Sequence, residues 1–353
     1  MSPAPLPVHS PDPAPSGPVD RWPAPGRSLL LAVAGGLAVA ALLGLLTDLR
    51  SLTGAVLAFD WRSLPAILGL TLGNYLLRFL KWHYYLRVLG VRDLPWSTSL
   101  LVFLSGLAMV VTPGKVGEWL KSYLLRTLRG VPVSASAPIV LAERLTDGLA
   151  LVVLATAGLV HADLWPLLTI GLAGLGLALV AQGTPLWLRL LDRLPAWPLV
   201  ERLVGPLRLF LQSARALLAP HRLLLGVGLG VVSWGGECLA FALVLAGLGA
   251  RLDLGLVREA AFAFAVAGLL GALSFLPGGL GVAEGSLTGL VLVRGLLSEP
   301  ARAVAAALLI RLGTLWFGVA LGWLALALLL RRWPHRRPSG ERADALPESS
   351  GRR

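Results

Sequence analysis

Charged side chains stand beside two breaks in otherwise apolar sequence. The first break lies in TPGKVGEWLK (112–121), and the second lies in LPGGLGVAEGS (276–286); both contain Pro-Gly-x-x-Gly. A helix that restarts after such a break presents free backbone N–H groups and the positive end of its dipole, which together favour an anion. The residues that predict the breaks are Pro113, Gly114, Gly117, Pro277, Gly278 and Gly281.

Ionisable residues within or beside apolar segments are the candidates for binding a phosphate-bearing headgroup. They are Arg78, Lys115, Glu118, Lys121, Glu143, Arg144, Asp147, Glu237, Glu284 and Arg311. Each would cost at least about 2.5 kcal/mol if it faced lipid, so they must face one another or water. Glu143 and Asp147 share one helical face, which is unfavourable unless a cation lies between or opposite them. Basic members would bind phosphate and acidic members would neutralise charge or relay protons; the alternative is a buried ion-pair network that only fixes helix registry.

Composition sets the class of protein that must position these residues. Of 353 residues, 56% are apolar and 14% are charged, whereas soluble domains are nearer a quarter charged. One cysteine and five scattered histidines predict no metal site and no cofactor. The net charge of +12 comes mostly from arginines that flank apolar segments, which indicates membrane orientation and not nucleic-acid binding. We therefore expect an all-α polytopic membrane protein with about six to eight transmembrane helices.

Domain limits and topology follow from the same pattern. We expect a disordered Pro-rich tail (1–27), a helical membrane domain (28–335) and a polar basic tail (336–353). The segment 47–63 suits an outside loop, and the basic segment 184–222 suits the cytoplasmic side, with an amphipathic helix along the surface. Both termini are then cytoplasmic, in a bacterial-type plasma (inner) membrane.

Lysine and arginine positions also fix the side of the next loop. We expect Lys81, Arg87 and Arg92 to bring the chain back to the cytoplasmic side. The charges after 112 then make a full crossing over 97–130 unfavourable, so a re-entrant hairpin broken at Pro-Gly fits better than a kinked crossing.

Two units repeat the same order of features, the first over about 62–160 and the second over about 222–330. Each has a charged residue twelve positions before a glycine, then an aspartate, the break, and an arginine in a later apolar helix. These residues are Arg78, Gly90, Asp93 and Arg144 in the first unit and Glu237, Gly249, Asp253 and Arg311 in the second. The charge pattern places the units in opposite orientations, with hairpins that enter from opposite sides. Inverted repeats of this kind place one site of a transporter near the midplane.

The motifs TPGKVGEWLK, AERLTDGLAL, LPGGLGVAEGS and LLIRLGTLWF occur in this order, with a glutamate-bearing helix before the third. This arrangement resembles the transmembrane region of the lysylphosphatidylglycerol synthase family, also called flippase-like domain proteins, over about 28–332. The resemblance implies movement of aminoacylated phospholipid between leaflets, as assigned to the membrane region of bifunctional members. No soluble synthase domain follows residue 335, so we expect aminoacyl transfer to be absent. Motif positions are occupied by Pro113, Gly114, Gly117, Glu118, Lys121, Glu143, Arg144, Asp147, Pro277, Gly278, Gly281, Glu284 and Arg311.

Three functions compete at this point. The leading one is a lipid flippase or transporter for an anionic, zwitterionic or aminoacylated phospholipid, or for a lipid-linked sugar. No GxxxxGK[ST] motif occurs, so transport would be passive or ion-coupled. A membrane enzyme acting on a lipid headgroup would need a nucleophile or metal that the sequence does not supply, so we expect no enzyme activity. The third function is a scaffold for a separate synthase or transferase; the oligomeric state stays open.

Overall fold

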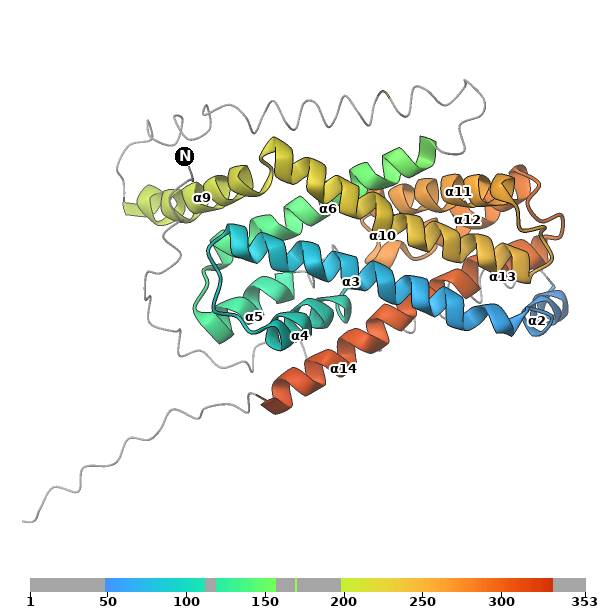
Figure 1. The fold of residues 1–353 in the computed structure, drawn as a ribbon, viewed down its shortest axis with the longest axis horizontal. Helices are drawn as coiled ribbons and strands as arrows, with labels where there is room; N and C mark the ends of the chain where they lie inside the picture. The colour runs from blue at the N-terminus through green and yellow to red at the C-terminus, as the bar shows by residue number, and fades with distance from the viewer. Residues whose placement is uncertain (1–47, 112–118, 157–168, 170–197, 333–353) are drawn as a thin grey trace, which may run out of the picture.

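The computed structural model describes residues 48–111, 119–156, 169 and 198–332, and the regular elements within them are helical (Figure 1). This confirms the all-α class. The helices are α2 (Leu49–Leu57), η2 (Trp61–Ser63), α3 (Leu64–Val88), α4 (Trp96–Leu107), α5 (Leu120–Arg129), α6 (Val133–Ala155), α9 (Pro198–Leu217), α10 (Pro220–Gly247), α11 (Leu254–Leu273), η6 (Pro277–Gly279), α12 (Val282–Val293), α13 (Pro300–Arg311), η7 (Leu312–Trp316) and α14 (Phe317–Arg332).

Long apolar helices provide the membrane-crossing elements. Within the described residues, four helical stretches have the length and hydropathy to cross a bilayer: Trp61–Val88, Pro220–Gly247, Leu254–Leu273 and Pro300–Arg332. α6, with 23 residues, has the length as well, and its charged motif AERLTDG lowers its hydropathy. The chain is therefore polytopic.

A pair of consecutive helices forms each of the two hairpins. α4 has 12 residues and α5 has 10, so they span only about 18 Å and 15 Å, too short for a hydrocarbon core of about 30 Å. They pack against each other, and residues 112–118 between them lie outside the described part of the chain. In the second half, α11 packs along α12, and the chain reverses between them.

The second break is as the sequence predicts. A 3-10 turn occupies Pro277–Gly279, and Gly278 and Gly281 have φ of 60° and 83°. Phe275, just before the break, also has a positive φ of 54°, which is uncommon for an aromatic residue and stores strain. With Gly279, four residues of positive φ thus lie between α11 and α12.

The two halves pack in matching ways. α3 and α10 lie side by side and run in opposite directions, while α4 packs along α14 and α11 packs along α6 (Figure 1). α3 and α10 also end alike: Gly90 and Gly249 have positive φ, and the N–H of the next residue bonds to the carbonyl five residues back. α4 and α5 lie at one end of the view and α11 and α12 at the other (Figure 1).

The hydrophobic core also divides between the halves. One cluster surrounds α10, α11 and α13 and includes Phe241, Phe264 and Ile310. The other surrounds α3, α4 and α6 and includes Trp82 and Ile139. Each cluster draws most of its residues from one half, and the contacts of α3 with α10, α4 with α14 and α6 with α10 and α11 join the halves.

Two expectations about local structure need correction. The loop expected at 47–63 contains α2, which begins where Asp48 accepts hydrogen bonds from two N–H groups of the first turn, and then η2. The helix expected over 301–330 contains a π turn, η7, directly after Arg311. Tyr75 of α3 donates a hydrogen bond of 2.6 Å to a carbonyl in that turn, at Thr314.

Other expectations concern parts of the chain outside the described residues. These are the tail 1–27, the apolar run 28–46, the segments 157–168 and 170–197, and the tail 336–353. Within the predicted basic segment 184–222, α9 is a helix that packs on α6. Its placement on a membrane surface stays a prediction.

Candidate functional site

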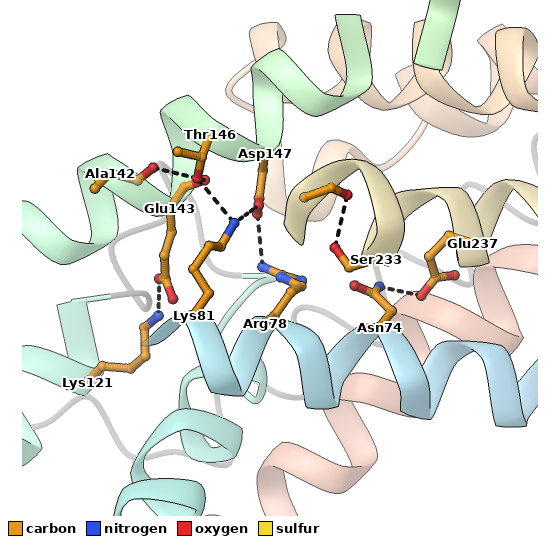
Figure 2. Close-up of polar contacts among 11 residues, drawn as sticks. Asn74, Arg78, Lys81, Lys121, Ala142, Glu143, Thr146, Asp147, Ser233 and Glu237 are labelled. Carbon is orange, nitrogen blue, oxygen red and sulfur yellow. Dashed lines mark hydrogen bonds and ion pairs between the residues drawn. The ribbon is translucent and has the colours of Figure 1, made fainter. Parts of the chain in front are cut away.

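Polar residues form one stripe along α3. Thr71, Asn74, Arg78 and Lys81 recur at intervals of three and four residues, so they share one face of the helix. Thr71, Asn74 and Lys81 are buried, and Arg78 is half-buried. This face meets α6 and α10, so its polar groups are bonded inside the protein (Figure 2).

Asp147 of α6 has two cations opposite it. Lys81 Nζ lies 2.5 Å from Asp147 Oδ1 and also donates to the Thr146 hydroxyl at 3.1 Å. Arg78 Nη2 lies 3.5 Å from Asp147 Oδ2, and its guanidinium stacks over Trp234, 5.5 Å from the ring centroid. Because Lys81 already neutralises Asp147 at close range, Arg78 is the cation with the weaker hold on its partner.

A second ion pair joins α5 to α6. Lys121 Nζ donates to Glu143 Oε2, and both side chains are buried. The ammonium also lies over the rings of Trp82, at 4.6 Å, and Phe103, at 5.5 Å. These aromatic faces stabilise a buried ammonium beyond the ion pair itself.

The third ion pair closes the second break. Arg311 Nε donates to Glu284 Oε1 at 2.6 Å, and Arg311 Nη2 donates to the carbonyl of Gly278 at 2.5 Å. Glu284 Oε2 accepts the N–H of Gly281, at 2.7 Å. One arginine and one glutamate thereby hold both ends of the PGGLG segment.

These last two pairs have opposite polarity. In the first half, the helix after the break carries the cation (Lys121) and the following helix carries the anion (Glu143). In the second half, the helix after the break carries the anion (Glu284) and the following helix carries the cation (Arg311). Each pair nevertheless joins the helix that follows the break to the next helix in the chain.

Glu237 of α10 has a different environment. Its carboxylate accepts a hydrogen bond of 2.5 Å from Asn74 Nδ2, and the Thr71 hydroxyl lies 3.5 Å away. Its exposed fraction is 1%. Figure 2 shows Arg78 between Asp147 on one side and the Asn74–Glu237 pair on the other.

The ends of the two hairpins approach each other. Val111, the last described residue before the first break, packs with Leu315 and Val319. A Cβ atom placed on Gly278 would lie 3.1 Å from Val111 Cγ1, so the second break contacts the chain at the entrance to the first. Five predicted residues of the first break lie outside the described residues, namely Pro113, Gly114, Lys115, Gly117 and Glu118.

The structure brings together most of the described candidates. Arg78 meets Asp147, Lys121 meets Glu143, and Arg311 meets Glu284; Arg144 is half-buried next to Glu143 on α6. The cations expected opposite Glu143 and Asp147 are thus present. Among the described residues, no three His, Cys, Asp or Glu side chains come together to hold a metal ion.

Sequence reasoning missed three members of the site. From the sequence, Lys81 is a charge beside an apolar segment and a marker of the cytoplasmic side, but not one of the candidate site residues; in the structure it is buried at 1% exposure against Asp147. Asn74 and Thr71 are uncharged and are not among the candidates. Their spacing from Arg78 was the available signal, because residues at i, i+3, i+7 and i+10 share a helical face.

Comparison with known proteins places these residues in a family. The family model for the lysylphosphatidylglycerol synthase TM region matches residues 32–322. The chain belongs to this family. No curated protein matches it. The family and the four long apolar helices make the chain an integral membrane protein of the lysylphosphatidylglycerol synthase TM region family, which connects it with membrane lipids.

Proposed function

We propose that this protein moves a phospholipid, or another lipid with a charged headgroup, between the two leaflets of a membrane. The observation that carries the proposal is the contact of the second break with Val111, the last described residue of the α4 side of the first hairpin, beside buried ion pairs. Non-helical backbone at membrane depth is tolerated where it is buried in protein or lines a polar cavity, and transporters use such breaks to bind ionic groups. Transport, and not catalysis, is the activity that this arrangement favours.

Arg78 and Arg311 are the best placed cations for a phosphate. Their side chains are 12% and 16% exposed, against 2% for Lys81 and 7% for Lys121. A guanidinium has five N–H donors and matches phosphate geometry with two parallel bonds. The arginines therefore combine charge with some access, whereas the lysines serve the buried ion pairs.

A lipid substrate also needs room for apolar chains. An apolar pocket of about 310 Å³ lies beside α3 and the π turn, and residues on both sides of Arg311 in the sequence, Leu309 and Leu312, contribute to its lining. The lining includes Phe59, Trp61, Ile67, Leu312, Gly313 and Trp316. A charged group and an apolar pocket at neighbouring positions suit an amphipathic molecule.

The test is translocation of fluorescent phosphatidylglycerol and an aminoacylated analogue in proteoliposomes, read by quenching at the outer surface. We expect faster exchange with wild type than in protein-free vesicles, and slower exchange with Arg78→Gln. Arg78→Lys separates bidentate binding from charge, because it keeps the cation and loses the planar fork. The matched control is Arg302→Gln, since Arg302 forms an exposed ion pair with Glu299.

A scaffold function is the second candidate, favoured by the completeness of the Lys121–Glu143 and Arg311–Glu284 pairs. A structural pair can be replaced by apolar residues at little cost, whereas removal of one partner is costly. A scaffold for a separate synthase or transferase would therefore tolerate Lys121→Met combined with Glu143→Met. Loss of exchange in that folded double variant would count against it.

We also propose a plasma membrane location with both termini cytoplasmic. The support is the flanking charge: Arg331 and Arg332 end α14, and basic residues dominate 184–222.

A further inference from the structure

Glu237 differs from the other buried acids of the site. Glu143, Asp147 and Glu284 each have a lysine or arginine nitrogen within ion-pair distance. In the described part of the chain, the hydrogen-bond partners of Glu237 are the neutral groups of Asn74 and Thr71. A carboxylate that is buried without a directly bound cation is costly unless it can change its protonation state.

We infer that Glu237 binds and releases a proton, and that this proton is the coupling ion for lipid movement; the second part rests on the proposed function. In the step, one carboxylate oxygen forms an O–H bond with a proton, no electrons are transferred, and the site gains one positive charge. Each of the other three acids instead has a cation fixed against it.

Asn74 suits both protonation states of its neighbour. Its Nδ2 donates to the ionised carboxylate at 2.5 Å. Its Oδ1 is buried and has no hydrogen-bond partner among the described residues. A half-turn of the amide presents that oxygen to a protonated Glu237, which then donates its O–H. A lysine or arginine in this place has no acceptor, so it could not accept the O–H of the protonated form.

The surroundings of Glu237 supply few other ionisable groups. On α3 these are Arg78 and Tyr75, and the hydroxyl of Tyr75 is engaged with the π turn. On α10 the neighbour is Cys238. The charged residues of α6 are Glu143, Arg144 and Asp147, and Asp147 lies beyond Arg78 in Figure 2. α11 and α13 present mainly alanine and other apolar side chains to α10.

Charge balance connects the proton with the lipid. Arg78, Lys81, Lys121 and Arg144 carry four positive charges against three negative charges on Asp147, Glu143 and Glu237. A proton on Glu237 raises the excess of positive charge from one to two, and Arg78 is the cation with the weaker hold on Asp147. An anionic phosphate is then attracted to Arg78. By thermodynamic reciprocity, the phosphate also strengthens binding of the proton.

The first test is infrared spectroscopy of the reconstituted full-length protein as the pH is lowered from mildly alkaline to mildly acidic. We expect the C=O stretch of a desolvated protonated carboxyl to grow reversibly, and to be lost in Glu237→Gln. Glutamine keeps the size of the side chain and still accepts the Asn74 N–H, so this variant retains the packing. Glu299→Gln is the matched control, because Glu299 is exposed and its loss leaves the desolvated band unchanged.

Absence of the band, or its persistence in Glu237→Gln, overturns the inference whether or not lipid moves. Loss of the band on addition of Na⁺ at constant pH also overturns it, because the site would then bind a metal cation. The coupling is tested by imposing a pH gradient on proteoliposomes that contain phosphatidylglycerol. Gradient-driven exchange in wild type, lost in Glu237→Gln, supports it. Exchange that is insensitive to the gradient refutes the coupling and leaves the flippase proposal intact, whereas no exchange in any vesicle refutes the flippase proposal.

Discussion

The Arg311–Glu284 pair gives a quantitative prediction about the second break. Arg311→Gln leaves the Glu284 carboxylate, 3% exposed, without its cation and the Gly278 carbonyl without a donor. Breaking a buried pair from one side costs about 3–5 kcal/mol, so we expect a loss of that size in the free energy of unfolding.

The partner substitution should cost less. In Glu284→Gln the amide oxygen can still accept the Gly281 N–H, and Arg311, 16% exposed, can reach some water. We expect about 1.5–3 kcal/mol for this change, the range of one lost charged hydrogen bond. The double variant should lose less than the sum of the two, with a coupling of about 1–3 kcal/mol.

Reversible unfolding by SDS in mixed micelles measures these free energies. The control is Arg302→Gln. Its ion pair with Glu299 has side chains 43% and 60% exposed, and Arg302 also donates a hydrogen bond of 3.3 Å to the Leu248 carbonyl, so we expect a loss of only about 1 kcal/mol. Strict additivity of the two single variants would show that Arg311 and Glu284 do not act as a pair. A loss for Arg311→Gln no larger than for Arg302→Gln would refute the role of Arg311 at the break.

Three further predictions concern backbone space, a single hydrogen bond and topology. Gly279→Ala should lower the free energy of unfolding by about 1–3 kcal/mol in the same assay, because Gly279 has a positive φ and its added Cβ would lie 3.0 Å from the α11 backbone. Gly285→Ala is the control: Gly285 has open space around it in α12, so this change should be neutral or stabilising. Tyr75→Phe should cost about 1 kcal/mol and speed amide hydrogen exchange in the π turn, and unchanged exchange there would contradict the role of the hydroxyl. For topology, single cysteines replace Arg92 or Arg251, in the loops after α3 and α10, in a background without the native cysteine. They should react with an impermeant reagent from opposite sides of the membrane. Labelling of both from the same side would disprove the inverted orientation.

The sequence predicted the class of fold and the position of the second break because both rest on local chemistry. An apolar run of spanning length has few alternatives to a helix, and Pro-Gly-x-x-Gly supplies the positive φ values that Gly278 and Gly281 adopt. It also predicted that Glu143 and Asp147 needed cations, because two acids one turn apart repel.

The choice of partners depends on packing between distant helices, which composition does not reveal. Lys81 could be interpreted as a flanking charge until α6 was placed against α3. The same holds for Asn74, an ordinary polar residue until Glu237 lies opposite. The π turn after Arg311 leaves no mark in LLIRLGTLWF, since one extra residue in a helical turn needs no special residue type.

The opposite polarity of the Lys121–Glu143 and Glu284–Arg311 pairs has a consequence for folding in the membrane. Two similar halves in one chain can misassemble by exchanging equivalent helices. If α5 docked against α13, Lys121 would face Arg311, and if α12 docked against α6, Glu284 would face Glu143. Both wrong partnerships place like charges together where water cannot screen them, so each hairpin is directed to the helix that follows it in its own half.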